Sequence, residues 1–527
     1  MSRSRDLLIL GMLVLVPALL LSMLYWDRPE TLLTSDTLTS AELIWDLLHH
    51  AGAWSTFQHP HSPEFVPADV VFGIIQAATG GWRIAMAAWV FVMLAWMIAV
   101  GSAIAGDNAR TSATAAAPAF LSLMVPIMTA AAFYPEGAFF PWFLLLLPGQ
   151  HGGTLLLALT GGLVARQAAK TGSQSSLFGL AAISFAAQAS DQLCLFSLLA
   201  PATAAALGSL IAGTISRPAA GRLIAAVWCG AATGGLITAP IERQFMPPPT
   251  LSYLATHARH FLADIGHYPL VIAACLCVCL ILIFELWRRG LRATIGGFWP
   301  IFGGTTVVGG LAFTIMFYED AWSFRYALPA LWWTLIFAAS GLSNLNARHR
   351  KQTWTTAGAT IGGLAILILA QGLHLPGLFT WTSPLSTCLR GEGLQSGLAD
   401  YWIARKASMG SDWTAQIQPI DAYGAARVWG NDWQWFTHDI HDQQRRPAYR
   451  FIVMDNLPVD RITAAYGPPD RTMSCGTSAV WIYNDSTKVF DNLARASSFM
   501  ADIFAAAPTP SSQALSSSPG IVEASTR

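Results

Sequence analysis

The sequence predicts a polytopic α-helical membrane protein with about eleven transmembrane helices, followed by a small C-terminal extracytoplasmic α/β domain. Three observations carry this prediction. The chain has 527 residues, of which 54% are hydrophobic and only 11% are charged, whereas soluble domains carry about 25% charged residues. Long apolar runs alternate with polar connections, and the composition becomes that of a soluble domain after Gln371. The formal net charge is zero, so we expect no nucleic-acid partner.

The first apolar run follows two basic residues, Arg3 and Arg5, as in a signal peptide. The run is longer than a signal peptide requires, and no small-residue cleavage site follows it. We therefore expect a retained first helix.

A transmembrane helix needs about 20 mostly apolar residues. The candidate spans are 7–25, 82–105, 114–134, 150–167, 176–190, 193–214, 223–240, 269–287, 294–316, 324–342 and 354–374. The apolar segment Val66–Thr79 is too short to span and is expected to lie at the membrane surface.

The charges in the connections predict the orientation. Every second connection is short and basic, which marks the cytoplasmic side; these carry Arg110, Arg166, Lys170, Arg217, Arg222, Arg288, Arg289, Arg292, Arg348, Arg350 and Lys351. The alternate connections carry Asp36, Glu64, Glu136, Asp191, Glu242, Asp264, Glu319 and Asp320. We expect a multi-pass protein of the bacterial inner (plasma) membrane, with a cytoplasmic N-terminus and an extracytoplasmic C-terminus.

Three parts follow from this layout: a transmembrane domain over 1–374 with an outward loop over 26–69, an α/β domain over 375–485, and an amphipathic helix with a disordered tail over 486–527. Within the α/β domain we expect strands at Tyr449–Asp455 and Ala479–Asn484 and a helix over Val459–Tyr466 closed by Gly467. Cys388 and Cys475 lie in this polar region, and whether they form a disulfide stays open. The segment Trp429–Trp435 is either a carbohydrate platform or part of the core of the domain.

The outward loop contains a candidate catalytic residue, Asp36, just before a helical pattern over Leu38–His50. Either Asp36 or Ser35 suits a helix N-cap. Asp36 also suits a general base, because a helix start that is fixed by packing would hold its side chain in a rigid position. The N-cap and general-base roles are compatible. Glu42 and Asp46 share a helix face four residues apart, and we expect this face to be solvated.

Two further outward connections contain candidate site residues. Asp191 lies between two apolar runs, where a charge is costly and is often functional; the alternative is a turn residue at the water interface. Arg325 begins a span on the outward side, and its guanidinium could form bidentate hydrogen bonds with a phosphate. The alternatives are an arginine at a helix end or one paired with Glu319. His151 and Glu136 border another outward loop, and we interpret both as structural.

The histidines of the first loop do not follow a metal-binding pattern. His49 and His50 are followed by His59-Pro60-His61, and this spacing matches no standard zinc site. We assign no metal ligand from the sequence and expect these residues at the membrane boundary.

The layout resembles the GT-C superfamily of membrane glycosyltransferases, including the aminoarabinose transferase and protein mannosyltransferase groups. The matching residues are Asp36 with the helix over Leu38–His50, and Phe324-Arg325-Tyr326 with Pro329. Members of these groups often place a second acid beside the first, whereas Asp36 is flanked by Ser35 and Thr37. The resemblance therefore implies that Asp36 acts alone, or with Asp191 or Glu42.

The resemblance also implies an inverting transfer of a sugar from a polyprenyl-phosphate donor to a glycan, lipid or protein acceptor. Asp36 and Asp191 are the candidate catalytic residues, and Arg325, Tyr326 and Glu42 are the candidate substrate-binding residues. The resemblance leaves a divalent metal ion open as a cofactor, with Arg325 as the other cation that stabilises the leaving phosphate. Two alternatives are a transporter or flippase of a lipid-linked or envelope substrate and a non-catalytic envelope assembly protein.

Overall fold

The computed structural model describes residues 2–508 except 51, 61, 136–138, 239–249, 270–271, 274–275, 278–279, 281–296, 345–346 and 372–376. Most of the expected span 269–287 lies outside the described residues, as do Glu136, Glu242, Arg288, Arg289, Arg292 and the tail beyond residue 508. The side chains of Arg348 and Arg350 are not described either. The chain forms two compact units: Met1–Leu32 with His59–Thr380 (unit 1), and Leu33–Gln58 with Trp381–Arg527 (unit 2).

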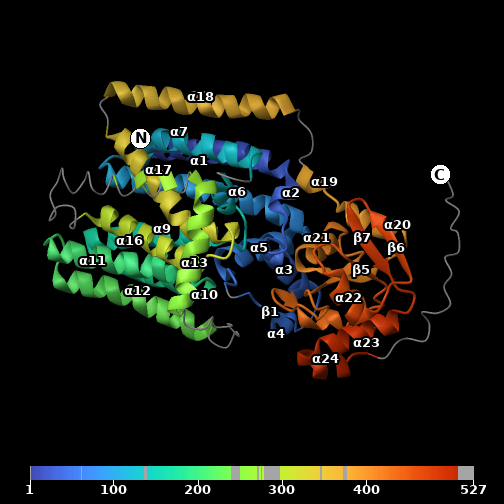
Figure 1. The fold of residues 1–527 in the computed structure, drawn as a ribbon. Coiled ribbons are helices and arrows are strands. Elements are labelled where there is room, and N and C mark those ends of the chain that lie inside the picture. The colour runs from blue at the N-terminus through green and yellow to red at the C-terminus, as the bar shows by residue number, and fades with distance from the viewer. Residues whose placement is uncertain are drawn as a thin grey trace. The chain divides into compact units, whose positions relative to one another are not determined.

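Unit 1 is helical in its described residues (Figure 1). Its elements are α1 (Ser2–Trp26), α2 (Pro29–Leu32), η1 (Phe65–Asp69), α5 (Val70–Thr79), α6 (Trp82–Asn108), α7 (Ala113–Phe133), α8 (Phe140–Leu144), α9 (Gly152–Thr171), α10 (Gln174–Ser190), η3 (Leu195–Leu199), α11 (Ala200–Ile211), α12 (Arg217–Thr238), α13 (Leu251–Asp264), η4 (Ile265–His267), α16 (Phe298–Met316), η5 (Ala321–Ala327), α17 (Leu328–Ser343), α18 (Ala347–Gln371) and α19 (Gly377–Thr380).

Seven helices among the described residues are long and apolar enough to cross a membrane, which indicates an integral membrane protein. They are Ser4–Trp26, Trp82–Asn108, Ala113–Phe133, Arg217–Thr238, Phe298–Met316, Trp322–Ser343 and Lys351–Gln371. Each coincides with one of the expected spans. The segments expected at 150–167, 176–190 and 193–214 are helical as α9, α10 and η3–α11, but they are shorter or less apolar.

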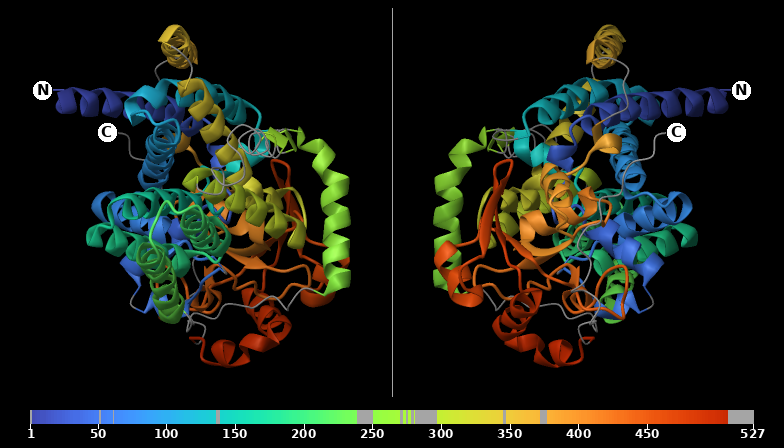
Figure 2. Two further views of the ribbon diagram at one scale, coloured as in Figure 1. Left: turned by 90° about the vertical axis from the view of Figure 1, so that its left-hand side faces the viewer. Right: turned by 90° about the vertical axis from the view of Figure 1, so that its right-hand side faces the viewer.

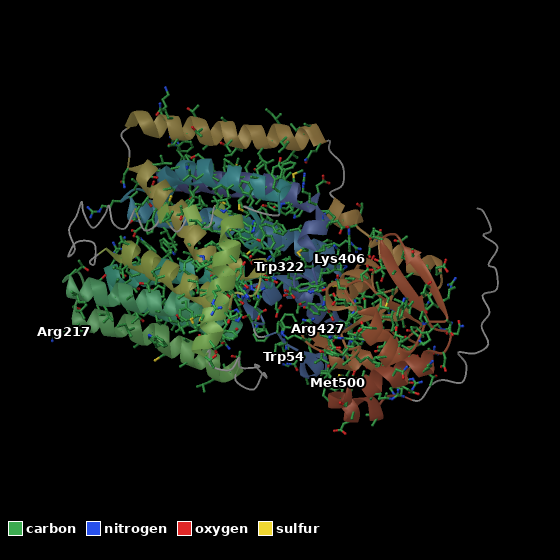
Figure 3. All side chains as sticks on the ribbon, in the orientation of Figure 1. Trp54, Arg217, Trp322, Lys406, Arg427 and Met500 are labelled. Carbon is green, nitrogen blue, oxygen red and sulfur yellow. A yellow bond between two sulfur atoms is a disulfide. The ribbon has the colours of Figure 1, made fainter. Side chains whose placement is uncertain are left out.

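Glycines allow α12 to approach α10 closely. A Cβ atom on Gly230 would lie 2.2 Å from the backbone oxygen of Ala181, and one on Gly234 would lie 2.5 Å from that of Phe185. This is the small-xxx-small arrangement by which helices pack in membranes. The two helices lie side by side in Figures 1 and 2, and in Figure 3 Arg217 lies at the first turn of α12.

Gly230→Leu is expected to force α10 and α12 apart and to destabilise unit 1 by about 1–3 kcal/mol, the usual cost of overpacking. Gly221→Leu is the matched control, because a Cβ atom on Gly221 of the same helix meets nothing within 4 Å. Thermal unfolding in detergent measures the difference. Equal midpoints for the two variants would contradict the close packing.

Unit 2 contains the C-terminal region together with α3 (Thr39–His49), α4 (Ala53–Thr56) and β1 (Phe57–Gln58) from the first loop. Its other elements are α20 (Pro384–Gly391), β2 (Ser396–Asp400), α21 (Tyr401–Gly410), β3 (Gln416–Ile420), β4 (Asn431–Asp432), η6 (Trp433–Phe436), β5 (Phe451–Val453), α22 (Val459–Tyr466), β6 (Arg471–Cys475), β7 (Ser478–Ile482), α23 (Ser486–Ala496), η7 (Ser498–Met500) and α24 (Ala501–Ala505).

A five-stranded mixed sheet organises unit 2, in the order β3-β2-β5-β7-β6. β2 runs parallel to β3 and β5, whereas β7 is antiparallel to β5 and β6. Alternate residues of β5 face opposite sides: Ile452 joins the apolar cluster that contains residues of α22–α24, and Phe451 and Val453 join the one that contains residues of α20 and α21. Helices therefore cover both faces of the sheet.

The local predictions for this region are largely confirmed. The helix over Val459–Tyr466 has the predicted bounds and ends at Gly467, whose positive φ of 80° favours glycine. Strands β5 and β7 lie at the two predicted segments. The amphipathic segment at the end divides into α23 and α24. A disulfide joins Cys388 to Cys475, which resolves the alternative that the sequence left open.

A short ladder fixes the first loop to the C-terminal part of unit 2. Phe57 and Gln58 of β1 pair with Asp432 and Asn431 of β4 in antiparallel register. Helix α3 begins at Thr39 with Leu38 as its N-cap and no capping side chain. The predicted N-cap role of Asp36 or Ser35 is therefore wrong, and their side chains make other contacts.

Candidate functional site

The structure divides the predicted site residues between the two units. Asp191, Arg325 and Tyr326 lie in unit 1, and Asp36 and Glu42 lie in unit 2. Each group belongs to a polar cluster that includes residues not assigned to a site from the sequence.

The first cluster consists of Glu64, His151 and Asp191, all buried, with exposed fractions of 2%, 6% and 2%. Glu64 precedes η1, His151 precedes α9, and Asp191 ends α10. The Nδ1 atom of His151 lies 2.6 Å from Asp191 Oδ2. Glu64 accepts hydrogen bonds from the backbone nitrogens of His151 (2.5 Å) and Gly149 (2.9 Å). Three connections that are far apart in the sequence therefore meet at one buried polar point.

The backbone of this cluster is held in an uncommon conformation. Glu64 and His151 have φ values of 52° and 65°, in the left-handed region that residues with a side chain rarely adopt. Such residues concentrate at functional sites, where the surrounding structure compensates for the strain.

Burial and charge set the protonation of the two carboxyl groups in opposite directions. Burial raises the pKa of Glu64 to about 7, although His151 opposes this shift. Burial also raises the pKa of Asp191, but the attraction and hydrogen bond of His151 outweigh it, so this pKa lies below its usual value. The backbone nitrogen of Leu193 (2.9 Å) and the Ser62 hydroxyl (3.0 Å) donate to Asp191 Oδ1 and contribute to the lowering. Asp191 is therefore the ionised carboxylate of the cluster.

Arg325 and Tyr326 lie next to this cluster. The Arg325 guanidinium donates to Gln150 Oε1 (3.2 Å) and to the Tyr326 hydroxyl (3.1 Å). The rings of Tyr326 and His151 have centroids 5.1 Å apart. Asp320 caps the turn that carries Arg325 by accepting from the Trp322 nitrogen. Two residues, Tyr326 and His151, thus lie between the Arg325 guanidinium and Asp191.

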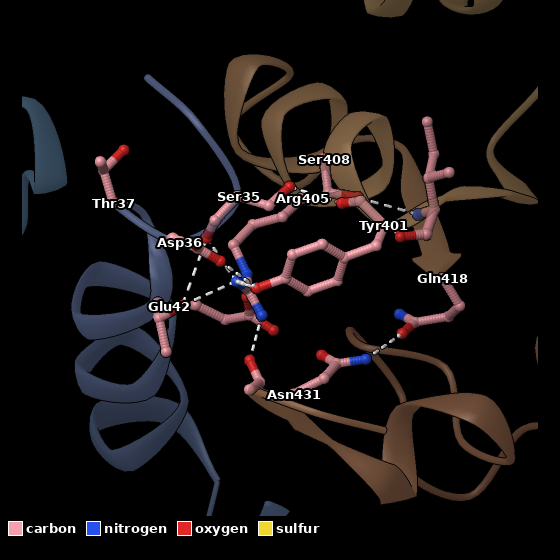
Figure 4. Close-up of polar contacts among 12 residues, drawn as sticks. Ser35, Asp36, Thr37, Glu42, Tyr401, Arg405, Ser408, Gln418 and Asn431 are labelled. Atoms are coloured by element: carbon pink, nitrogen blue, oxygen red, sulfur yellow. Dashed lines mark hydrogen bonds and ion pairs between the residues drawn. The ribbon is translucent and has the colours of Figure 1, made fainter. Parts of the chain in front are cut away.

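The second cluster surrounds Arg405 of α21, which is buried (Figure 4). Its guanidinium forms an ion pair with Glu42 and donates to the backbone oxygens of Ser35 (2.5 Å) and Gly430. The Tyr401 hydroxyl donates to Asp36 Oδ1 (2.8 Å). Burial lowers the pKa of Arg405 to about 9, and Asp36 opposes the shift. Arg405 therefore stays charged at neutral pH.

The solvated face predicted for α3 is wrong. Glu42 is 2% exposed and Asp46 is fully buried, because this face packs inside unit 2. Asp46 contacts His50 Nδ1 and accepts from Trp435 Nε1 (3.2 Å). The Trp435 ring also packs on Trp45, with centroids 5.8 Å apart, so Trp435 belongs to the interior of unit 2.

The buried carboxyl group of Asp432 makes the stability of unit 2 depend on pH. Burial and the adjacent Asp46 raise the pKa of Asp432 to about 8. The folded state therefore retains a proton that the unfolded state releases near 3.8. The resulting stability is complete below pH 3.8 and is lost as pH rises through 8. We expect unit 2 to lose about 1–3 kcal/mol between pH 6 and pH 9.

Asp432→Asn is expected to remove this loss, because an amide can still accept from the Thr56 hydroxyl, which donates to Asp432 Oδ2 at 2.7 Å. Hydrogen exchange of η6 amides at both pH values, corrected for intrinsic rates, measures the effect. An identical pH dependence in the wild type and the variant would contradict a protonated Asp432.

The histidines of the first loop contribute little to these clusters. His49 contacts the Trp45 backbone oxygen, and His50 contacts Asp46 and the Ile440 oxygen. His59 is buried in unit 1, and burial lowers its pKa to about 4. His61 lies outside the described residues.

Glu64 and His151 of unit 1 were not assigned to a site from the sequence, which contains one indication of their role. Gln150-His151 interrupts an apolar run, whereas Glu64 is one acidic residue among several in the outward loops of the sequence. Nothing in the sequence distinguished Tyr401 or Arg405 from other polar residues of a soluble helix.

Comparison with protein-family models, curated proteins and solved structures finds no match.

Proposed function

We propose that this protein is an integral membrane glycosyltransferase that moves a sugar from a polyprenyl-phosphate donor to an acceptor on the extracytoplasmic side of the bacterial inner membrane. One observation carries the proposal. In a unit built of membrane-crossing helices, Arg325 is held by Gln150 and Tyr326 beside the buried Glu64–His151–Asp191 cluster. A guanidinium suits a phosphate, and lipid headgroups lie on either side of the hydrocarbon core, near the ends of the helices that span it.

The chemistry is an inverting displacement. A carboxylate takes the proton of the acceptor hydroxyl, the acceptor oxygen bonds to the anomeric carbon, and the bond from that carbon to the phosphate oxygen breaks. The developing charge of the leaving polyprenyl phosphate is assigned to Arg325 of unit 1, where Asp191 is a candidate base. Asp36 of unit 2 is the candidate base that the resemblance implies, and its variant is tested separately. The polar contacts of Arg325 orient it before any ligand binds.

The orientation belongs to the same proposal. Basic connections alternate with acidic ones over about eleven spans, which favours a cytoplasmic N-terminus and an outward unit 2. The Cys388–Cys475 disulfide agrees with an oxidising compartment for unit 2.

A transporter is the second candidate, because buried ionisable clusters also form proton relays in membrane carriers. The two functions differ in product: a transporter moves its substrate unchanged, whereas a transferase separates the sugar from the lipid phosphate. Release of radiolabelled sugar from a panel of polyprenyl-phosphate donors by the reconstituted protein therefore discriminates between them.

Arg325→Gln is expected to weaken binding of undecaprenyl phosphate by about 10–100-fold, the equivalent of losing a charged hydrogen bond to the phosphate. Native mass spectrometry of the protein in nanodiscs measures this binding. Arg217→Gln is the matched control, because Arg217 is an exposed arginine at the start of α12. Unchanged binding by Arg325→Gln, or equal loss in both variants, would count against the phosphate role of Arg325.

A further inference from the structure

The Glu64–His151–Asp191 cluster has the composition of a metal site. One ligand atom from each side chain can be chosen so that the three lie within 4.8 Å of one another. We propose that these residues bind a divalent transition-metal cation of the zinc or manganese class. The role of the ion in transfer depends on the proposed function, but its binding does not.

The donor set argues for this class of ion. One imidazole nitrogen and two carboxylate oxygens suit zinc and manganese, whereas magnesium and calcium prefer oxygen ligands alone. Bonds of about 2.1 Å place two ligands of one ion at most about 4.2 Å apart. The atoms of the cluster therefore need only a small movement to reach bonding distance. Three protein ligands leave an open coordination position, as in catalytic sites.

Further contacts hold each ligand in place, as in established metal sites. Two backbone nitrogens, of Gly149 and His151, donate to Glu64. The Ser62 hydroxyl and the Leu193 nitrogen donate to Asp191 Oδ1, which leaves Oδ2 directed at His151. The Tyr326 ring packs against the imidazole. The partners of Asp191 use Oδ1 and leave Oδ2 for the ion, which would replace the present 2.6 Å contact between Oδ2 and His151 Nδ1. The Oε atoms of Glu64 would bind the ion while they accept from the two backbone nitrogens.

Charge balance supports the same conclusion. A metal ion binds the ionised carboxylates and the neutral imidazole, and in that form the cluster would carry two negative charges in a nearly fully buried space. Burial of unbalanced charge is costly, and one divalent cation would balance both carboxylates. The open position would then accept an oxygen of the leaving phosphate next to Arg325, which increases the electrostatic stabilisation there.

The test is binding of the metal alone to the purified full-length protein. After chelator treatment and dialysis, calorimetry with ZnCl₂, MnCl₂ and MgCl₂ is expected to give one site per chain for zinc or manganese and at least 10-fold weaker binding of magnesium. Asp191→Asn and His151→Asn are expected to weaken zinc binding by about 10–100-fold. Asparagine can retain the contacts of Asp191 with Ser62 and Leu193, and it tolerates the left-handed backbone of His151.

Asp107→Asn is the matched control, because Asp107 is a carboxylate of the same unit that pairs with Arg166 and Lys170. Equal zinc binding by the wild type, Asp191→Asn and His151→Asn would refute the site, as would an equal loss in Asp107→Asn. If a variant does not fold, pulsed electron paramagnetic resonance of Mn²⁺ on the wild type decides: a ¹⁴N coupling is expected, and its absence would refute the site. Zinc binding without transfer from any donor would refute the proposed function alone.

Discussion

Asp36→Asn is expected to reduce sugar transfer by about 10²–10⁴-fold, the usual contribution of a general base, while the protein still inserts and folds. The amide can accept the hydrogen bond that the Tyr401 hydroxyl donates to Asp36 Oδ1 at 2.8 Å. The substitution therefore removes the charge and the basicity but retains the local contact. Initial rates of label transfer at saturating donor measure the effect.

Tyr401→Phe separates catalysis from structure at this position. It removes the same hydrogen bond and leaves the carboxylate, so a base role for Asp36 predicts a much smaller loss of kcat. Equal losses in the two variants would assign Asp36 to structure alone. Full activity of Asp36→Asn would show that Asp36 is not the general base, and Asp191 would then be the remaining candidate base.

Glu42→Gln is expected to destabilise unit 2 by about 3–5 kcal/mol, because it leaves the buried guanidinium of Arg405 without its opposite charge. The backbone oxygens of Ser35 and Gly430 and the Thr39 hydroxyl would still accept from Arg405, but none of them carries a negative charge. Asp36 would remain as a negative charge near Arg405, so about 3–5 kcal/mol is the upper end of the expected loss. The loss should appear as a lower unfolding midpoint of unit 2.

The double variant Glu42→Met/Arg405→Met is the control for this pair. Replacing both partners of a buried ion pair by apolar residues is often neutral, so the double variant is expected to be more stable than Glu42→Gln. A double variant as unstable as the single one would mean that the loss comes from the missing contacts of Arg405 and the packing around α21, and not from an uncompensated charge.

The sequence predicted the elements whose signals are local. The helix over Val459–Tyr466 has an amphipathic pattern and a glycine stop, and both survive in the structure. The seven apolar helices likewise depend only on length and composition. Both kinds of element can be predicted without knowing which residues contact one another in the folded protein.

The clusters depend on residues that meet across long stretches of sequence, and there the predictions were incomplete. Glu42 and Asp46 look solvated because their spacing suits an exposed helix face, but a face against another polar surface has the same pattern. Arg405 lies 363 positions after Glu42, so no local pattern could connect them. His151 was interpreted as structural because its partners, Glu64 and Asp191, lie in other connections.

The inclusion of residues 33–58 in unit 2 has a consequence for biosynthesis. At roughly 5–20 residues per second, the ribosome needs about 20–70 s to proceed from Glu42 to Arg405. During this time α3 presents Glu42 and Asp46 without the partners that neutralise and enclose them. We therefore expect this segment of the nascent chain to remain without its partners, and open to capture by chaperones or proteases, until the last quarter of translation. Variants that slow completion of the C-terminal region should therefore lower the yield of protein before they affect its chemistry.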